Sequence, residues 1–104
     1  MTDNIRVWTA DSILDFLRAN RQHLIDLGVQ RIGLFGSYAR GHQKPGSDID
    51  ILVTMQRPSF DDFMDTKFFL EDSFGIQVDL VPENGVKEAL RSNIMKEVLY
   101  VEDF

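Results

Sequence analysis

Two carboxylates stand inside an otherwise apolar, strand-like segment, and few folds accommodate that arrangement. Residues 48–53 read DIDILV, in which Ile49, Ile51 and Val53 alternate with Asp48, Asp50 and Leu52. Because successive strand side chains point to opposite faces, the pattern fits a sheet with an apolar core on one face. The Cα atoms of Asp48 and Asp50 would be ~6.6 Å apart, with both carboxylates projecting the same way. Carboxylates that close repel each other unless a cation lies between them.

A later segment repeats the pattern with a single carboxylate. Residues 76–81 read IQVDLV, so the apolar side chains can face the core while Asp79 faces away. If the two strands are neighbours, Asp48, Asp50 and Asp79 converge on one patch. Three hard oxygen ligands without His or Cys suit Mg²⁺ or Mn²⁺. Two such ions, ~3.5–4 Å apart, stabilise the attacking and leaving oxygens of an in-line phosphoryl displacement.

A Gly-Ser pair supplies a candidate phosphate site. The segment RIGLF, residues 31–35, predicts a short strand, and Gly36 and Ser37 follow it where SYAR could open a helical turn. Backbone N–H groups at such a turn bind phosphate, and glycine permits close approach. The Ser37 hydroxyl adds a donor, and the nearby cations Arg40 and Lys44 can meet a triphosphate or the leaving pyrophosphate.

The rest of the chain predicts helices around these strands. Apolar periodicity indicates helices over residues 11–27, 59–74 and 86–99, the second with Ser59 as N-cap. The apolar side of that second helix is expected to carry Phe60, Phe63, Met64 and Phe74. The order of elements predicts an α/β or α+β fold, with a small mixed sheet of three to four strands and helices packed on one face. A chain of 104 residues fits one domain over residues 1–104.

Composition excludes several classes of function. The chain has no cysteine, which excludes disulfides and thiolate zinc sites, and its net charge of −6 disfavours binding to long nucleic acid. No apolar run approaches the roughly 20 residues of a membrane span, and the N-terminus lacks the apolar stretch of a signal peptide. A soluble, cytoplasmic protein with no direct nucleic-acid or membrane partner is therefore expected.

The combined motif resembles a known signature. FGSYARGHQKPGSDIDILV followed by VDLV resembles that of the polymerase-β-type nucleotidyltransferase superfamily: hydrophobic-Gly-Ser, Asp-hydrophobic-Asp-hydrophobic, and a third Asp on a later strand. The short form GSYARG…SDIDILV is similar to the minimal nucleotidyltransferases, and the resemblance covers nearly the whole chain. It implies the polymerase-β-type nucleotidyltransferase fold. It also implies a catalytic, metal-binding role for Asp48, Asp50 and Asp79.

The same resemblance implies a biological role. Minimal nucleotidyltransferases resemble the antitoxins of bacterial and archaeal two-gene modules, whose partner is a small helical ribonuclease of the HEPN class. Their expected reaction transfers AMP from ATP to a tyrosine hydroxyl of that toxin and silences it. Two Mg²⁺ ions, or Mn²⁺, are the implied cofactors, and a hetero-oligomer with the toxin is the implied assembly. The short chain leaves no room for a second substrate-binding domain, which fits an acceptor supplied by another protein.

Two other functions stay open at this point. The acceptor could be a small molecule, as in aminoglycoside nucleotidyltransferases, although those enzymes usually carry an additional helical domain. Alternatively, the chain could be a non-catalytic antitoxin that neutralises its partner by binding alone. For a partner interface, the sequence suggests Tyr100, Val101 and Phe104 near the end of the chain, or the phenylalanine-rich helix over residues 59–74.

Overall fold

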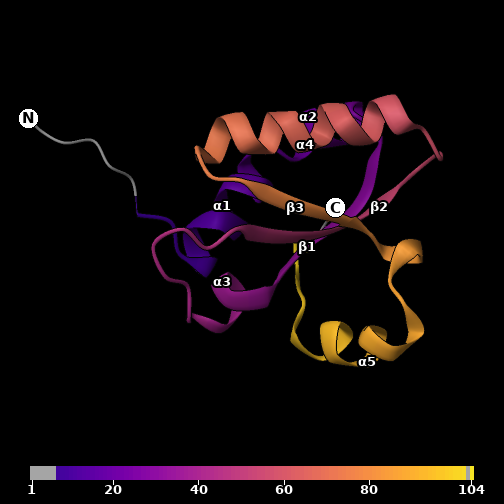
Figure 1. Ribbon diagram of the computed structural model, residues 1–104. Coiled ribbons are helices and arrows are strands. Elements are labelled where there is room, and N and C mark those ends of the chain that lie inside the picture. Colours follow the sequence, from indigo (N-terminus) through magenta and orange to yellow (C-terminus); the bar gives the residue numbers. More distant parts are fainter. Residues whose placement is uncertain (1–6, 103) are drawn as a thin grey trace, which may run out of the picture.

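A four-stranded mixed sheet forms the centre of the protein. The computed structural model describes residues 7–102 and 104, and its strands follow the order β3-β2-β1-β4 (Figure 1). The strands are β1 (Val29–Phe35), β2 (Ile49–Met55), β3 (Val78–Pro82) and β4 (Leu99–Tyr100). Strand β1 pairs antiparallel with β2 and β4, whereas β2 and β3 are parallel. The predicted fold class and strand number are confirmed.

Helices lie on both sides of this sheet. They are α1 (Ala10–Ala19), α2 (Arg21–Asp26), α3 (Gly36–Arg40), α4 (Phe60–Phe74), the 3₁₀ helix η1 (Glu83–Gly85) and α5 (Glu88–Glu97). Figure 1 shows α4 above the sheet and α3 and α5 below it. The main core contains buried residues of α1, α2 and α4 packed with Ile32, Leu34, Ile49 and Ile51 of the central strands. The expectation of helices on one face therefore holds for α1, α2 and α4, whereas α5 lies on the other side and α3, also drawn below the sheet, still contributes Tyr38 to the core.

The period-2 pattern of β2 has the predicted effect. Ile49 and Ile51 are fully buried and Val53 is 1% exposed, whereas Asp48 is exposed and Asp50 is partly buried. Leu52 is also fully buried although it shares the face of Asp50. The second face of the sheet is therefore open at the aspartates and covered further along β2.

The predicted helix over residues 11–27 is two helices. Chain direction changes at Asn20, where φ is −104° and ψ is 20°. The Asn20 side-chain amide donates a hydrogen bond to the Phe16 carbonyl oxygen at 2.9 Å. Asparagine side chains compete in this way with helical backbone bonds, which explains the break. Ile13, Leu17 and Leu24 still form the predicted buried stripe.

Helix α4 has the predicted ends, and Phe63 and Phe74 of its predicted apolar side pack in or against the core. Ser59 caps it, accepting from the Asp62 N–H at 3.2 Å, and Gly75 ends it in the left-handed conformation. Its buried residues are Thr66, Leu70 and Phe74. Phe60, expected on the apolar side, is 75% exposed. It stands in the first turn, which borders a hollow beside Pro82 and Glu83 rather than the core.

The end of the chain differs from the expected long helix. Helix α5 ends at Glu97, and Leu99 and Tyr100 pair with Leu34 and Gly33 of β1. Val101 is 3% exposed and Phe104 packs against the core. Val101 is therefore wrong as an interface residue, because it is part of the hydrophobic core. Between residues 7 and 102, the longest helix has 15 residues, and no helix is long and apolar enough to cross a membrane.

Candidate active site

Asp50 and Asp79 are paired across neighbouring strands. The parallel register of β2 and β3 sets Asp50 opposite Asp79, and Asp48 directly precedes β2. The start of this ladder is fixed by the Ile49 N–H, which donates to the Gln77 carbonyl oxygen at 3.0 Å. Helix α4 also holds the start of β3, because the carboxylate of its residue Glu71 accepts a hydrogen bond from the Val78 N–H at 3.0 Å. The adjacency on which the carboxylate patch depends is thus present.

The electrostatics of the patch centre on Asp50. Burial, followed by the charges of Asp79 and Asp48, raises the pKa of the Asp50 carboxyl from 3.8 to about 6. Glu97 adds to this rise, while the Arg40 guanidinium opposes it. Raised pKa values of this kind occur where like charges are gathered for binding or catalysis. A divalent cation among these oxygens would relieve the repulsion.

Gly36 lies directly against the Asp50 carboxyl. A Cβ atom on Gly36 would overlap with the Asp50 Oδ2 atom and lie 2.8 Å from its Cγ atom. The φ angle of Gly36 is +77°, which side-chain-bearing residues rarely adopt. Glycine is therefore required here for two reasons, and the loop and the carboxylates form one site.

The other residues predicted to bind phosphate differ in how clearly the structure places them near the carboxylates. Ser37 is partly exposed in α3, and Arg40 lies in the last turn of the same helix. The charge of Arg40 acts on Asp50, which places its guanidinium near the carboxylates. Lys44 lies in the loop before β2, where its N–H donates to the Ser47 Oγ atom at 2.9 Å. Among the described residues, the Lys44 ammonium makes no ion pair or hydrogen bond.

Glu97 belongs to the site although no sequence motif indicates it. Its Oε2 atom accepts a hydrogen bond from the Gly36 N–H at 2.8 Å. Its Oε1 atom accepts from the Arg40 Nη1 atom, also at 2.8 Å. Glu97 is the last residue of α5 and is 61 positions from Gly36, so local sequence gave no signal of the contact.

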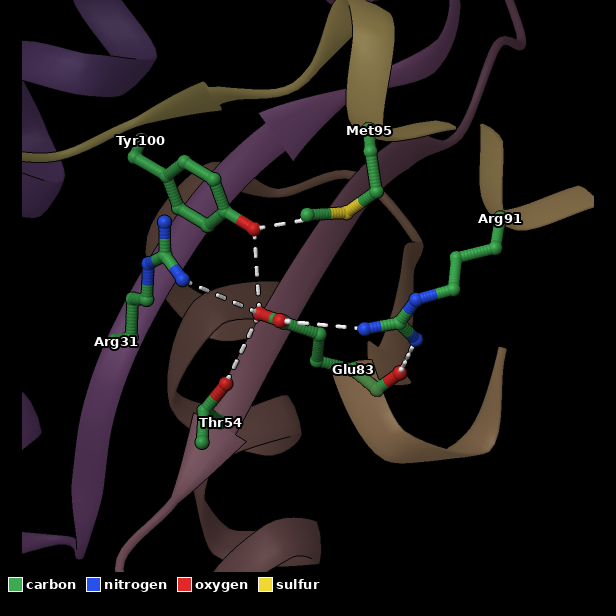
Figure 2. A network of polar contacts seen from close by, with 6 residues as sticks. All are labelled: Arg31, Thr54, Glu83, Arg91, Met95 and Tyr100. Carbon is green, nitrogen blue, oxygen red and sulfur yellow. Dashed lines mark hydrogen bonds and ion pairs between the residues drawn. The ribbon is translucent and has the colours of Figure 1, made fainter. Parts of the chain in front are cut away.

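A second polar cluster occupies the opposite end of the same strands. Figure 2 shows Glu83 at its centre, accepting from the Thr54 and Tyr100 hydroxyls at 3.2 Å each. Arg31 and Arg91 form ion pairs with Glu83 at 3.9 and 3.8 Å. A hollow of about 590 Å³ also lies at this end, beside Met55 and Phe60. Asp48, Asp50 and Asp79 do not line it.

The chemistry of the three aspartates suits a metal ion, but their side chains are not arranged as a preformed metal site. Among residues 7–102 and 104, no group of three or more His, Cys, Asp or Glu side chains is arranged to hold an ion. Asp48, Asp50 and Asp79 nevertheless offer the hard oxygen donors that Mg²⁺ prefers, and burial together with the charges of Asp79 and Asp48 raises the pKa of Asp50.

Comparison with known proteins decides the family. Residues 11–101 match the family described as Nucleotidyltransferase domain. The chain belongs to this family. It is 39% identical over 95 residues to the protein adenylyltransferase MntA of Thermococcus cleftensis, in an alignment covering 89% of this chain and 96% of that protein.

Solved structures agree with this assignment. A chain provisionally described as a minimal nucleotidyltransferase is 34% identical, with a TM-score of 0.67, and the match covers 83% of this chain and 93% of that one. A toxin–antitoxin structure with AMP-PNP is 25% identical, with a TM-score of 0.65, covering 81% and 71%. The resemblance to minimal nucleotidyltransferases is confirmed, and this nucleotidyltransferase is an enzyme that transfers a nucleotidyl group.

Proposed function

We propose that this nucleotidyltransferase is an antitoxin that transfers AMP from ATP to a tyrosine hydroxyl of a partner HEPN ribonuclease toxin. One observation carries the proposal: Asp50 stands opposite Asp79 and directly against Gly36, which brings carboxylates and phosphate loop together. The identity to a protein adenylyltransferase over 96% of that relative's length supports adenylyl transfer to a protein. The likeness to a toxin–antitoxin structure with AMP-PNP supports a toxin as the partner and an adenine nucleotide as the donor.

The nucleotide phosphates are assigned to the loop after β1. The Gly36 N–H and the Arg40 guanidinium lie side by side and together bind one anionic group, the Glu97 carboxylate. The Ser37 hydroxyl adds a neutral donor, and Lys44 adds a flexible cation in the loop before β2. Guanidinium and backbone N–H donors are well suited to phosphate oxygens.

Two Mg²⁺ ions, or Mn²⁺, are assigned to the three aspartates. Asp48 and Asp50 would contact both ions, and Asp79 would contact the ion on the acceptor side. When bound, such ions offset the negative charge that develops at the reacting phosphate and lower the pKa of a bound hydroxyl. The raised pKa of Asp50 is consistent with this role, since it reflects burial first and then the charges of Asp79 and Asp48, which a cation would offset.

The transfer itself requires one proton acceptor. The tyrosine oxygen attacks the α-phosphorus of ATP, the bond from that phosphorus to the bridging oxygen breaks, and pyrophosphate leaves. The hydroxyl proton, with an ordinary pKa near 10, passes to an Asp79 carboxylate oxygen. Asp79 suits this task because it is exposed at the edge strand of the sheet, open to an incoming chain.

The experiment that tests the function uses the partner protein. The HEPN protein encoded beside this chain, if the gene is present, is purified and incubated with the enzyme, ATP and Mg²⁺. Intact mass should show the addition of whole adenylyl groups, and substitution of the modified tyrosine should abolish it. Neutralisation of the ribonuclease without any mass increase would instead identify a binding antitoxin. Modification of a small-molecule acceptor with no change in the mass of the HEPN protein would identify a small-molecule nucleotidyltransferase.

A further inference from the structure

Glu97 holds the two donors that the triphosphate needs. The Gly36 N–H and the Arg40 Nη1 atom each donate to one oxygen of the Glu97 carboxylate at 2.8 Å. A bidentate anion between a backbone N–H and a guanidinium is the arrangement expected of a bound phosphate. Because Gly36 has a single N–H, it cannot serve Glu97 and a phosphate oxygen together at this length.

We propose that Glu97 is a displaceable occupant of the phosphate site, so that nucleotide binding expels its carboxylate while the backbone of α5 stays in place. The inference rests on the proposed function of the loop at Gly36. Glu97 thereby sets the affinity of the enzyme for nucleotides that carry β- and γ-phosphates.

Helix α5 packs loosely on the rest of the protein, so it does not enclose the Glu97 side chain. Within the described helix, Glu88–Glu97, no residue is buried, and Leu90 is 53% exposed. Elements with few buried apolar contacts open at low free-energy cost. At its other end α5 is held by Arg91, which donates to the Glu83 carbonyl oxygen at 3.1 Å and pairs with the Glu83 carboxylate (Figure 2). Beyond Glu97 the chain is held as well, because Leu99 and Tyr100 pair with β1, so the carboxylate leaves by rotation of its own side chain while both ends of the helix stay attached.

The groups that would separate already reach water. The side chains of Arg40 and Glu97 are 49% and 27% exposed. Their separation therefore leaves no charge buried without a partner, which is the usual obstacle to breaking an ion pair. The Glu97 carboxylate can be solvated once it leaves, while the phosphate takes its place on both donors.

The test measures binding of a non-hydrolysable ATP analogue with Mg²⁺, and of AMP, to the whole chain. Glu97→Ala should tighten the analogue about tenfold, because the nucleotide no longer has to break two charge-assisted hydrogen bonds. Glu97→Gln should give a smaller gain, since its amide oxygen can still accept from Gly36 but its charge is gone. AMP, which lacks β- and γ-phosphates, should gain little. Glu88→Ala removes the same charge from the exposed first turn of α5 and should leave both affinities unchanged.

Several outcomes would overturn the proposal. Unchanged or weaker analogue binding by both Glu97 variants would show that the carboxylate supports the site or ligates an ion. Equal gains for AMP and the analogue, or an equal gain in Glu88→Ala, would show a general charge effect. Urea denaturation checks that each variant is folded, and Glu97→Gln retains shape if Glu97→Ala does not fold. Absence of binding in the folded wild type as well would instead mean that the proposed nucleotide function is wrong.

Discussion

Asp50 and Asp79 stand opposite each other in the parallel pairing of β2 with β3. Neighbouring strands are ~4.8 Å apart, so this register gathers two carboxylates from segments well separated in sequence. Asp50 is the inner member of the pair, partly buried against Gly36, and Asp79 is the exposed one. The difference in environment leads us to expect different consequences when each is changed.

Neutralising Asp48 or Asp50 should abolish transfer without unfolding the protein. Asp48→Asn and Asp50→Asn are isosteric and remove charge from a patch of like charges, so the fold should persist. Transfer should fall by roughly 10²-fold or more, because each loses a proposed ligand of both ions. Single-turnover transfer to the partner, with Asp72→Asn on the exposed side of α4 as control, measures this. Near wild-type rates in either variant would contradict the two-ion assignment.

Asp50 should make the stability of the metal-free protein fall as pH rises. Its pKa is about 6 in the folded chain, against an ordinary 3.8. Between these values the folded state binds more protons than the unfolded state, so the free energy of unfolding decreases with increasing pH. Asp50→Asn should therefore stabilise the protein more at about pH 7 than at about pH 4. Urea denaturation of both proteins across this range, with chelator present, measures the difference. An equal difference at both ends would contradict the raised pKa.

Asp79→Asn should separate binding from transfer. The variant keeps an oxygen ligand and the shape of the side chain but loses the proposed proton acceptor. Binding of a non-hydrolysable ATP analogue with Mg²⁺ should persist within a few-fold, while transfer falls by roughly 10²-fold or more. Calorimetry and single-turnover rates on the same preparation test this. A parallel loss of binding would mean that Asp79 also holds the nucleotide's ion.

Two glycines with similar backbone angles provide a matched pair. Gly36 and Gly41 have φ values of +77° and +73°, but an added Cβ meets Asp50 at Gly36 and nothing within 4 Å at Gly41. Gly41→Ala should cost about 1–2 kcal/mol of stability, from the left-handed conformation alone. Gly36→Ala should cost more and should also weaken nucleotide binding, because the Asp50 carboxyl must move. Equal losses in both variants would show that conformation, and not the contact, requires Gly36.

Glu83 should control the ionisation of Tyr100. Burial raises the pKa of the Tyr100 hydroxyl, and the charge of Glu83 and its hydrogen bond add to the rise. Glu83→Gln removes that charge and should lower the pKa of Tyr100 toward its ordinary value. Alkaline titration of tyrosine absorbance measures it, with Tyr100→Phe identifying the transition against that of Tyr38. A midpoint that does not move would exclude Glu83 as a cause.

Local features, such as strand burial and helix ends, were predictable because each depends on residues close together in the sequence. The alternation of residues 48–53 predicted the burial of Ile49, Ile51 and Val53 but not that of Leu52, and Ser59 and Gly75 predicted both ends of α4. The Gly-Ser and Asp-x-Asp spacing predicted the family, which the comparison confirms. The roles of individual site residues stay predictions.

Other features were decided by contacts that no local pattern contains. The Asn20 side chain hydrogen-bonds to the Phe16 carbonyl oxygen and divides the expected helix into α1 and α2. Phe60 is exposed because the first turn of α4 lies beyond the core. The end of the chain leaves its helix to pair with the free edge of β1, which buries Val101.

The sequence by itself determined the buried apolar side of β2 and the turn at Gly36, because strand periodicity and glycine conformation act over a few positions. The tertiary structure alone decided that β2 and β3 are neighbours in the register that opposes Asp50 to Asp79. It also decided that Glu97 reaches the Gly36 N–H from 61 residues away. Such pairings depend on how whole elements pack, since a strand or a helix end carries no local mark of the partner it will meet.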